Sequence, residues 1–164
     1  MNKKVLFIVP LLILIVVNIL IISNSNKRIP TYKSDIICSY STVENYDDLD
    51  YESKSIIYIY KDEDNVTKTI NQSIMSTNSD TGLLESIISI YDSVDGIDAS
   101  LKNRGKSIVF EVVYDFKKID LDNTKEKLEN VLSQDSLLMK TEVLPIKVDA
   151  YLDLLSDKYK CEVQ

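Results

Sequence analysis

The stretch Ile108-Val109-Phe110-Glu111-Val112-Val113-Tyr114 decides the fold expected for this chain. Six of its seven residues are β-branched or aromatic, and such residues favour the pleated surface of a sheet. A turn sequence, Asn103-Arg104-Gly105-Lys106, precedes the stretch, and another apolar segment from Ile97 to Leu101 lies before that turn. The sequence therefore predicts a β-hairpin with strands at residues 97–101 and 107–116.

Three segments upstream of this hairpin also have the composition of strands. Each combines β-branched or aromatic residues with at least partial alternation of apolar and polar positions. They are residues 36–46, 55–60 and 66–70, with acidic turns expected at 46–52 and 61–65. In the last of these strands Lys68 lies on the same side as Val66 and Ile70. A charge in that row favours an edge strand over a central one.

Helical spacing of apolar residues marks three other segments. The first helix has N-cap candidates at residues 78–81 and is expected to end at Gly96. The second begins at Asp122 or Asn123, and the third covers residues 148–155. The apolar faces comprise Leu83, Leu84, Ile87, Ile88 and Tyr91, then Leu128, Val131 and Leu132, and finally Val148, Tyr151, Leu152 and Leu155.

The order of these elements predicts an α+β domain. Short turns between strands and helices grouped on one face indicate an antiparallel sheet of about five strands packed against two or three helices. Residues 136–143 fit neither helix nor strand clearly, and the segment around Cys161 is expected to be extended. One N-terminal transmembrane helix is expected to precede this domain.

The evidence for that helix is an apolar run from Val5 to Ile22, interrupted only by Pro10 and Asn18. At ~1.5 Å per residue a helix of this length approaches the ~30 Å hydrocarbon core of a bilayer. The favoured interpretation is an uncleaved anchor over residues 1–23, then a stalk at 24–35 and an extracytoplasmic domain at 36–164. The alternative is a secretory signal peptide cleaved near Ser23-Asn24-Ser25.

The two cysteines, Cys38 and Cys161, stand at the two ends of the predicted domain. In an oxidising compartment they would form a disulfide worth roughly 4–5 kcal/mol by the chain-entropy argument. The alternative is a pair of reduced thiols in a cytosolic domain. Lysines flank both sides of the apolar run, so charge does not decide the orientation. The cysteines favour a single-pass protein of the cell membrane with its C-terminal domain outside.

Composition argues against several classes of function. The chain has a formal net charge of -7, which makes nucleic acid a poor partner, and it lacks histidine altogether. Two distant cysteines without histidine or a C-x-x-C motif make a poor zinc site. We therefore expect no cofactor, no metal and no enzymatic activity; the expected partners are the membrane and an envelope protein.

The spacing of the acidic and basic residues argues against the candidate catalytic and metal-binding sites. The acidic stretch Asp47-Asp48-Leu49-Asp50-Tyr51-Glu52 lacks the glycine and glutamate positions of a calcium loop. Asp115 and Asp120 could act as a carboxylate pair, but two aspartates alone specify little. The sequence at 103–106 is not a phosphate-binding loop. The tyrosines of the first half are interpreted as half-buried sheet residues rather than as an interface; these are Tyr32, Tyr40, Tyr46, Tyr51, Tyr58 and Tyr60.

Several of these features together give a family resemblance. The apolar N-terminus leads to Cys38 in the first strand, the central strand continues into Tyr114-Asp115-Phe116-Lys117-Lys118-Ile119-Asp120, and the chain ends with Tyr159-Lys160-Cys161. In these features the chain resembles the small YehR-like family of extracytoplasmic proteins from low-GC Gram-positive bacteria. The resemblance implies a sheet-plus-helices domain whose two cysteines are joined. It supplies no known activity, and this chain departs from lipid-anchored members because it has no lipobox cysteine.

The sequence thus predicts a membrane-anchored extracytoplasmic domain that acts as a binding or accessory module at the cell envelope. One alternative is an envelope hydrolase that uses paired carboxylates. Another is a structural or assembly component that acts through its transmembrane helix, where Asn18 could contact a partner helix.

Overall fold

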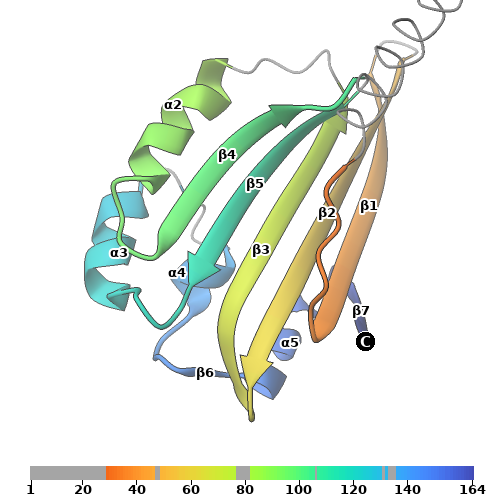
Figure 1. The fold of residues 1–164 in the computed structure, drawn as a ribbon. Coiled ribbons are helices and arrows are strands. Elements are labelled where there is room, and N and C mark those ends of the chain that lie inside the picture. The colour runs from red at the N-terminus through yellow and green to blue at the C-terminus, as the bar shows by residue number, and fades with distance from the viewer. Residues whose placement is uncertain (1–28, 47–48, 77–81, 106, 131, 133–135) are drawn as a thin grey trace, which may run out of the picture. The chain divides into compact units, whose positions relative to one another are not determined.

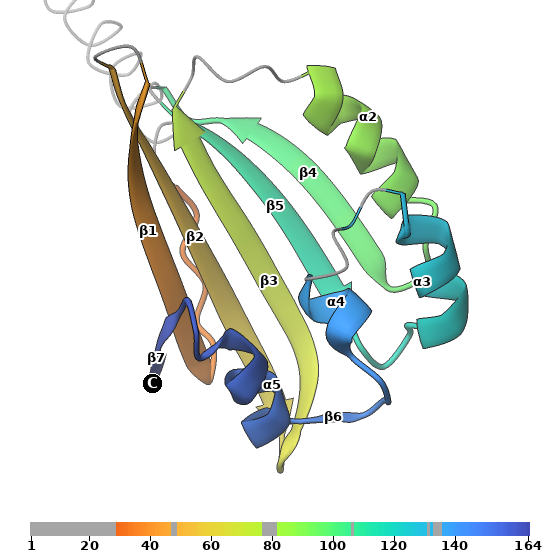
Figure 2. The ribbon, with the colours of Figure 1, turned by 180° about the vertical axis from the view of Figure 1, so that it is seen from behind.

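The computed structural model describes residues 29–46, 49–76, 82–105, 107–130, 132 and 136–164. Thr31–Gln164 forms one compact unit, an antiparallel sheet with helices on one face (Figures 1 and 2). The apolar run predicted to cross the membrane lies outside the described residues. Within the described part of the chain, no helix has the length and apolar character needed to span a bilayer.

The α+β class and the antiparallel sheet are confirmed, but the described sheet has seven strands rather than about five. Six of them follow the order β4-β5-β3-β2-β1-β7, and β6 pairs with the beginning of β3. The strands are β1 (Ile36–Tyr46), β2 (Leu49–Asp62), β3 (Asn65–Ser76), β4 (Ile97–Asn103), β5 (Ser107–Asp115), β6 (Ile146–Lys147) and β7 (Lys160–Val163).

Two expectations about the first three strands are wrong. Residues 49–52 belong to β2 rather than to an acidic turn, because β1 and β2 stay paired as far as Tyr46 and Leu49. β3 is a central strand between β2 and β5, whereas the charge of Lys68 predicted an edge. The ammonium of Lys68 lies 5.6 Å from the centre of the Tyr60 ring at the end of the sheet, so the charge avoids the apolar interior.

The helices are α2 (Gly82–Tyr91), α3 (Leu121–Leu128), α4 (Leu137–Lys140) and α5 (Val148–Leu155). The predicted third helix is confirmed as α5. The first, α2, ends at Tyr91, so the expectation that Gly96 terminates it is wrong. Gly96 instead has φ of 83° just before β4, and a Cβ there would lie 2.9 Å from the carbonyl oxygen of Asp115.

The second helix, α3, begins earlier than predicted. Its N-cap is Asp120, whose side chain accepts a hydrogen bond from the backbone N–H of Asn123 at 3.2 Å, so neither Asp122 nor Asn123 is the cap. The N-cap candidates at 78–81 and the apolar residue Val131 lie outside the described residues. Residues 136–143, ambiguous in sequence, contain the single turn α4.

The main core lies between the sheet and the helices. Tyr151 and Leu155 of α5 and Leu128 of α3 are buried against the sheet side that carries Ile57 and Ile59. Residues 31–35 cross the opposite face, hereafter the outer face, in front of β2 in Figure 1. These two faces carry very different polar groups.

The predicted disulfide is present. Cys38 of β1 and Cys161 of β7 stand opposite each other in the antiparallel register and are bonded, with 4.0 Å between their Cα atoms. The bond joins the first strand of the sheet to the last, across a sequence separation of 123 residues. It therefore fixes both ends of the domain at one place.

Candidate ligand-binding pocket

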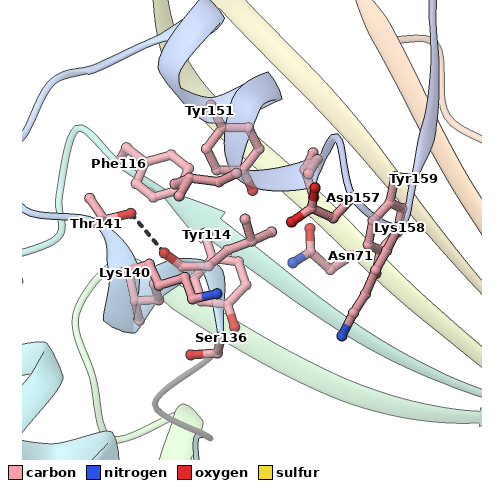
Figure 3. Close-up of a pocket in the computed structure, with 14 residues that line it drawn as sticks. Asn71, Tyr114, Phe116, Ser136, Lys140, Thr141, Tyr151, Asp157, Lys158 and Tyr159 are labelled. Atoms are coloured by element: carbon pink, nitrogen blue, oxygen red, sulfur yellow. Dashed lines mark hydrogen bonds between the residues drawn. The ribbon is translucent and has the colours of Figure 1, made fainter.

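A pocket of about 490 Å³ opens on the helix side of the sheet. Asn71 of β3 and Tyr114 of β5 form the part made by the sheet, α4 and α5 form the walls, and Asp157–Tyr159 close the side next to β7 (Figure 3). The volume suits a small molecule or one or two side chains of a peptide.

Asn71 is the most unusual group in this pocket. The register places it between Ile57 of β2 and Val112 of β5, both buried apolar residues of the main core. Its Oδ1 atom is buried and has no hydrogen-bond partner in the described structure. Leaving a buried acceptor unpaired costs roughly 1–3 kcal/mol, so folded proteins retain few of them. An acceptor in this position is suited to a ligand that brings a donor.

Four aromatic residues line the pocket, and three of them, Tyr114, Phe116 and Tyr151, have neighbouring rings. Phe116 lies 6.3 Å from the ring of Tyr114 and 6.2 Å from the ring of Tyr151. Burial raises the pKa of Tyr151, and burial together with a hydrogen bond to Tyr91 raises the pKa of Tyr114. Both phenols are therefore neutral at physiological pH, and they offer flat apolar surface together with hydroxyl groups.

Charged and polar side chains complete the lining. In the view of Figure 3 the side chains of Asn71, Asp157 and Lys158 lie at one end of the pocket, and Phe116 and Tyr151 lie at the other. Lys140 also lines the pocket, so both signs of charge are present. The pocket therefore has an apolar aromatic part and a polar part, the combination found in sites that orient a ligand.

The outer face carries a buried polar group of a different kind, the carboxylate of Glu111. Its oxygens accept hydrogen bonds from the Tyr32 hydroxyl at 2.7 Å, from Gln72 Nε2 at 3.0 Å and from Lys102 Nζ at 3.0 Å. The ring of Tyr32 meets the ring of Tyr58 edge to face, with 5.3 Å between centres. Tyr32 thereby attaches the segment at residues 31–35 to the sheet.

The pKa of Glu111 reflects these contacts. Burial alone would raise it, but the hydrogen bonds from Gln72, Tyr32 and Lys102 and the charge of Lys102 outweigh burial, and the pKa is lowered. Glu111 is therefore ionised at neutral pH. With three donors in place, it is a structural anion rather than a proton donor.

The structure places the predicted carboxylate pair in local roles. Asp115 forms an ion pair with Lys118 at 3.1 Å and accepts a hydrogen bond from the backbone N–H of Lys117. Asp120 caps α3, and neither aspartate lines the pocket described above.

Neither the turn sequence at 103–106 nor the acidic stretch at 47–52 contributes a described residue to the pocket lining. The stretch at 103–106 forms the β4–β5 connection, in which Asn103 Oδ1 accepts a hydrogen bond from the N–H of Gly105. In the acidic stretch, Asp47 and Asp48 lie outside the described residues. Over the part of the chain that is described, no three acidic or cysteine side chains gather as metal ligands would.

The tyrosines singled out in the sequence have separate surroundings. Tyr58 is buried on the outer face, Tyr60 and Tyr32 are partly buried, and Tyr40 is 37% exposed with its ring 5.8 Å from that of Tyr159. The side chains of Tyr46 and Tyr51 are not among those described. Tyr60 is half-buried on β2 as expected, whereas Tyr58 is buried, Tyr40 is exposed and Tyr32 lies before β1.

The sequence reasoning missed the pocket residues themselves. A signal was present, because Asn71 interrupts the β-branched composition of β3 with an amide. Only the register shows that this amide faces the core, since the strand boundaries predicted for β3 stopped at Ile70.

Comparisons of this chain with known protein families, with curated protein sequences and with solved structures find no match.

Proposed function

We propose that this chain is a membrane-anchored binding module of the cell envelope, and that its ligand occupies the pocket between the sheet, α4 and α5. The observation that carries the proposal is the unpaired, buried Oδ1 of Asn71 in the wall of that pocket. A ligand donor would remove the cost of the unpaired acceptor, and binding would be favoured by that amount.

The location outside the cytoplasm rests on two features. The apolar run from Val5 to Ile22 is long enough for an anchor. The bond between Cys38 and Cys161 is of the kind that persists in oxidising compartments and is rare in the cytosol. Both features support an anchored domain that faces the outside.

The residues that line the pocket indicate the chemistry of the ligand. It has an N–H or O–H donor for Asn71, and an aromatic or aliphatic part that packs on Phe116 and Tyr151. Among the described lining residues Asp157 is the one carboxylate, whereas glycoside hydrolysis by paired carboxylates requires two. The geometry therefore favours binding over that reaction.

The test uses the full-length protein in detergent and a panel of dipeptides, amino sugars and aromatic amines. Ligand-observed NMR should detect at least one compound class that binds the wild-type protein and does not bind Asn71→Leu. Ser73→Ala is the matched control, because Ser73 lies on the same strand, is exposed and does not line the pocket. Equal binding by wild type and Asn71→Leu would refute the pocket as the site.

A further inference from the structure

The edge of β1 is covered by β7 along only part of its length. β7 pairs with Ile36 to Ser39, and the register ends where Lys160 meets Ser39. β1 continues from Tyr40 to Tyr46 in unbroken pairing with β2 on its other side. Among the described residues, no strand pairs with this second half of β1 on the β7 side.

The hydrogen-bond pattern shows which backbone groups face that open edge. Cys38 and Cys161 stand opposite each other with 4.0 Å between their Cα atoms, the short spacing of a non-hydrogen-bonded antiparallel pair, so the backbone groups of the adjacent residues Ile37 and Ser39 face β7. Because backbone direction alternates along a strand, the odd-numbered residues of β1 face the same way. The N–H and C=O groups of Ser41, Val43 and Asn45 are therefore directed outward, where β7 no longer reaches.

Within the part of the chain that the structure describes, this edge lacks the usual protection against strand addition. Natural edge strands are shielded by proline, lysine, bulges or covering loops. The sequence from Tyr40 to Tyr46 contains no proline or lysine, and the β1–β2 register runs through it without a shift. At its centre the side chain of Val43 is 67% exposed, and Tyr40 is 37% exposed.

We propose that this edge pairs with the same edge of a second copy of the chain, about a two-fold axis through Val43. An antiparallel pairing centred there sets Val43 against Val43, Ser41 against Asn45, Thr42 against Glu44 and Tyr40 against Tyr46. The outward groups of Val43 then bond to those of its copy, and the two sheets become continuous.

The register also explains why the occupant is a second copy. In this alignment Glu44, the one charged residue from Tyr40 to Tyr46, takes the register position opposite the neutral Thr42 of the other copy, so the two Glu44 positions are not paired. The exposed valine is buried against itself, and the aromatic residues are opposed in pairs. A shift of one residue would place the outward groups out of phase.

One strand pair forms a small interface, below the roughly 1,200 Å² of a typical stable complex, so a weak and reversible dimer is expected. The test is sedimentation equilibrium of the full-length protein in density-matched detergent over a wide concentration range. Wild type should show a monomer–dimer equilibrium. Val43→Pro should shift its midpoint at least ten-fold toward monomer, because proline removes the outward N–H without removing a bond to β2.

The matched control is Val163→Pro. Val163 is also an exposed valine on an edge strand, 78% exposed on β7, and it lies outside the proposed contact. This variant should dimerise as wild type does. If Val43→Pro fails to fold by circular dichroism, Val43→Lys decides, because it sets two ammonium groups against each other across the axis.

Wild-type protein that stays monomeric at all concentrations would overturn the proposal. A dimer that survives both Val43 variants would also overturn it, because other residues, such as an anchor helix, would then hold the copies together. A Val43→Cys variant that links to itself through a short bismaleimide, with Val163→Cys failing to do so, would support the two-fold contact. Pocket binding has no part in these measurements.

Discussion

Two neighbouring residues of β3, Asn71 and Gln72, face opposite sides of the sheet and belong to different polar sites. Gln72 joins the Glu111 network on the outer face, where the carboxylate accepts three hydrogen bonds. Asn71 lines the pocket on the helix side with an unpaired Oδ1. The comparison teaches that the Glu111 carboxylate, with its hydrogen bonds made inside the domain, supports the architecture, whereas the Asn71 acceptor in the pocket is left for another molecule to complete.

The largest effect on stability should come from removing the disulfide between Cys38 and Cys161. Cys38→Ala with Cys161→Ala should lower the free energy of unfolding by roughly 4–5 kcal/mol, the chain-entropy value for so long a loop. The structure of the pocket should be disturbed more than that of the outer face, because Asp157–Tyr159 lead directly into β7, the strand that carries Cys161. Urea denaturation measures the loss, and a change below about 1 kcal/mol would contradict the expectation.

The next effect concerns the outer face. Glu111→Ala should cost about 3 kcal/mol, because Gln72, Tyr32 and Lys102 would lose a buried charged partner. Ligand binding in the pocket should be preserved if the protein is assayed well below its melting temperature. Asp98→Ala, which removes an exposed carboxylate on β4, is the control and should change stability little. A matching loss in that control would mean that net charge, not the network, is responsible.

A smaller change tests the attachment of the N-terminal segment. Tyr32→Phe keeps the edge-to-face contact with Tyr58 but deletes the hydroxyl that donates to Glu111. It should cost about 1–2 kcal/mol, in the range of hydrogen bonds to charged groups. Hydrogen exchange should accelerate at residues 31–35 and remain unchanged on α5. Unchanged exchange at residues 31–35 would show that the ring contact alone holds the segment.

On the helix side, replacing the buried polar group should raise the free energy of unfolding rather than lower it. Asn71→Leu removes an unpaired acceptor and fills the same volume with apolar atoms, so it should stabilise the domain by about 1 kcal/mol. The same substitution should abolish ligand binding. Stability would thus increase while ligand binding is lost, as expected where a binding residue lowers the stability of the fold. A destabilised Asn71→Leu protein would show that the amide is structurally required.

The smallest expected effect is on the pH dependence of stability, to which Glu111 on the outer face should contribute. The pKa of Glu111 lies below its ordinary value of 4.5 in the folded protein. Ionised Glu111 therefore contributes its full stabilisation of the fold at pH values above 4.5. As the pH falls from 4.5 through the folded pKa, the network should lose stability. Glu111→Gln should remove this part of the acid sensitivity in thermal melts between pH 6 and pH 2. An identical pH profile for the two proteins would exclude Glu111 as a source.

Local patterns predicted the elements better than their arrangement. The β5 strand, the β1 boundaries and α5 follow from residue composition and spacing within one segment, which a sequence contains directly. The central place of β3 depends on pairing with β5, more than thirty residues away, and the charge of Lys68 suggested the wrong position. Strand order is set by such distant pairings and cannot be derived from one segment alone.

The site was less predictable than the fold. Glu111 lies in the stretch from Ile108 to Tyr114 that predicts the sheet. Nothing in the neighbouring sequence shows that Tyr32, Gln72 and Lys102 donate hydrogen bonds to its carboxylate. Asn71 is likewise an ordinary amide until the register turns it toward the core. Hydrogen-bond saturation is a property of groups brought together in space, so it becomes visible only in the folded chain.

The bond between Cys38 and Cys161 turns almost the whole domain into a covalent ring. A protease that cuts once at any connection between these two residues, for example beside Gly105, would open the ring without releasing a fragment. The cut pieces would remain associated until a reductant separated them. A nicked domain should therefore migrate as two fragments on a reducing gel and as one species without reductant.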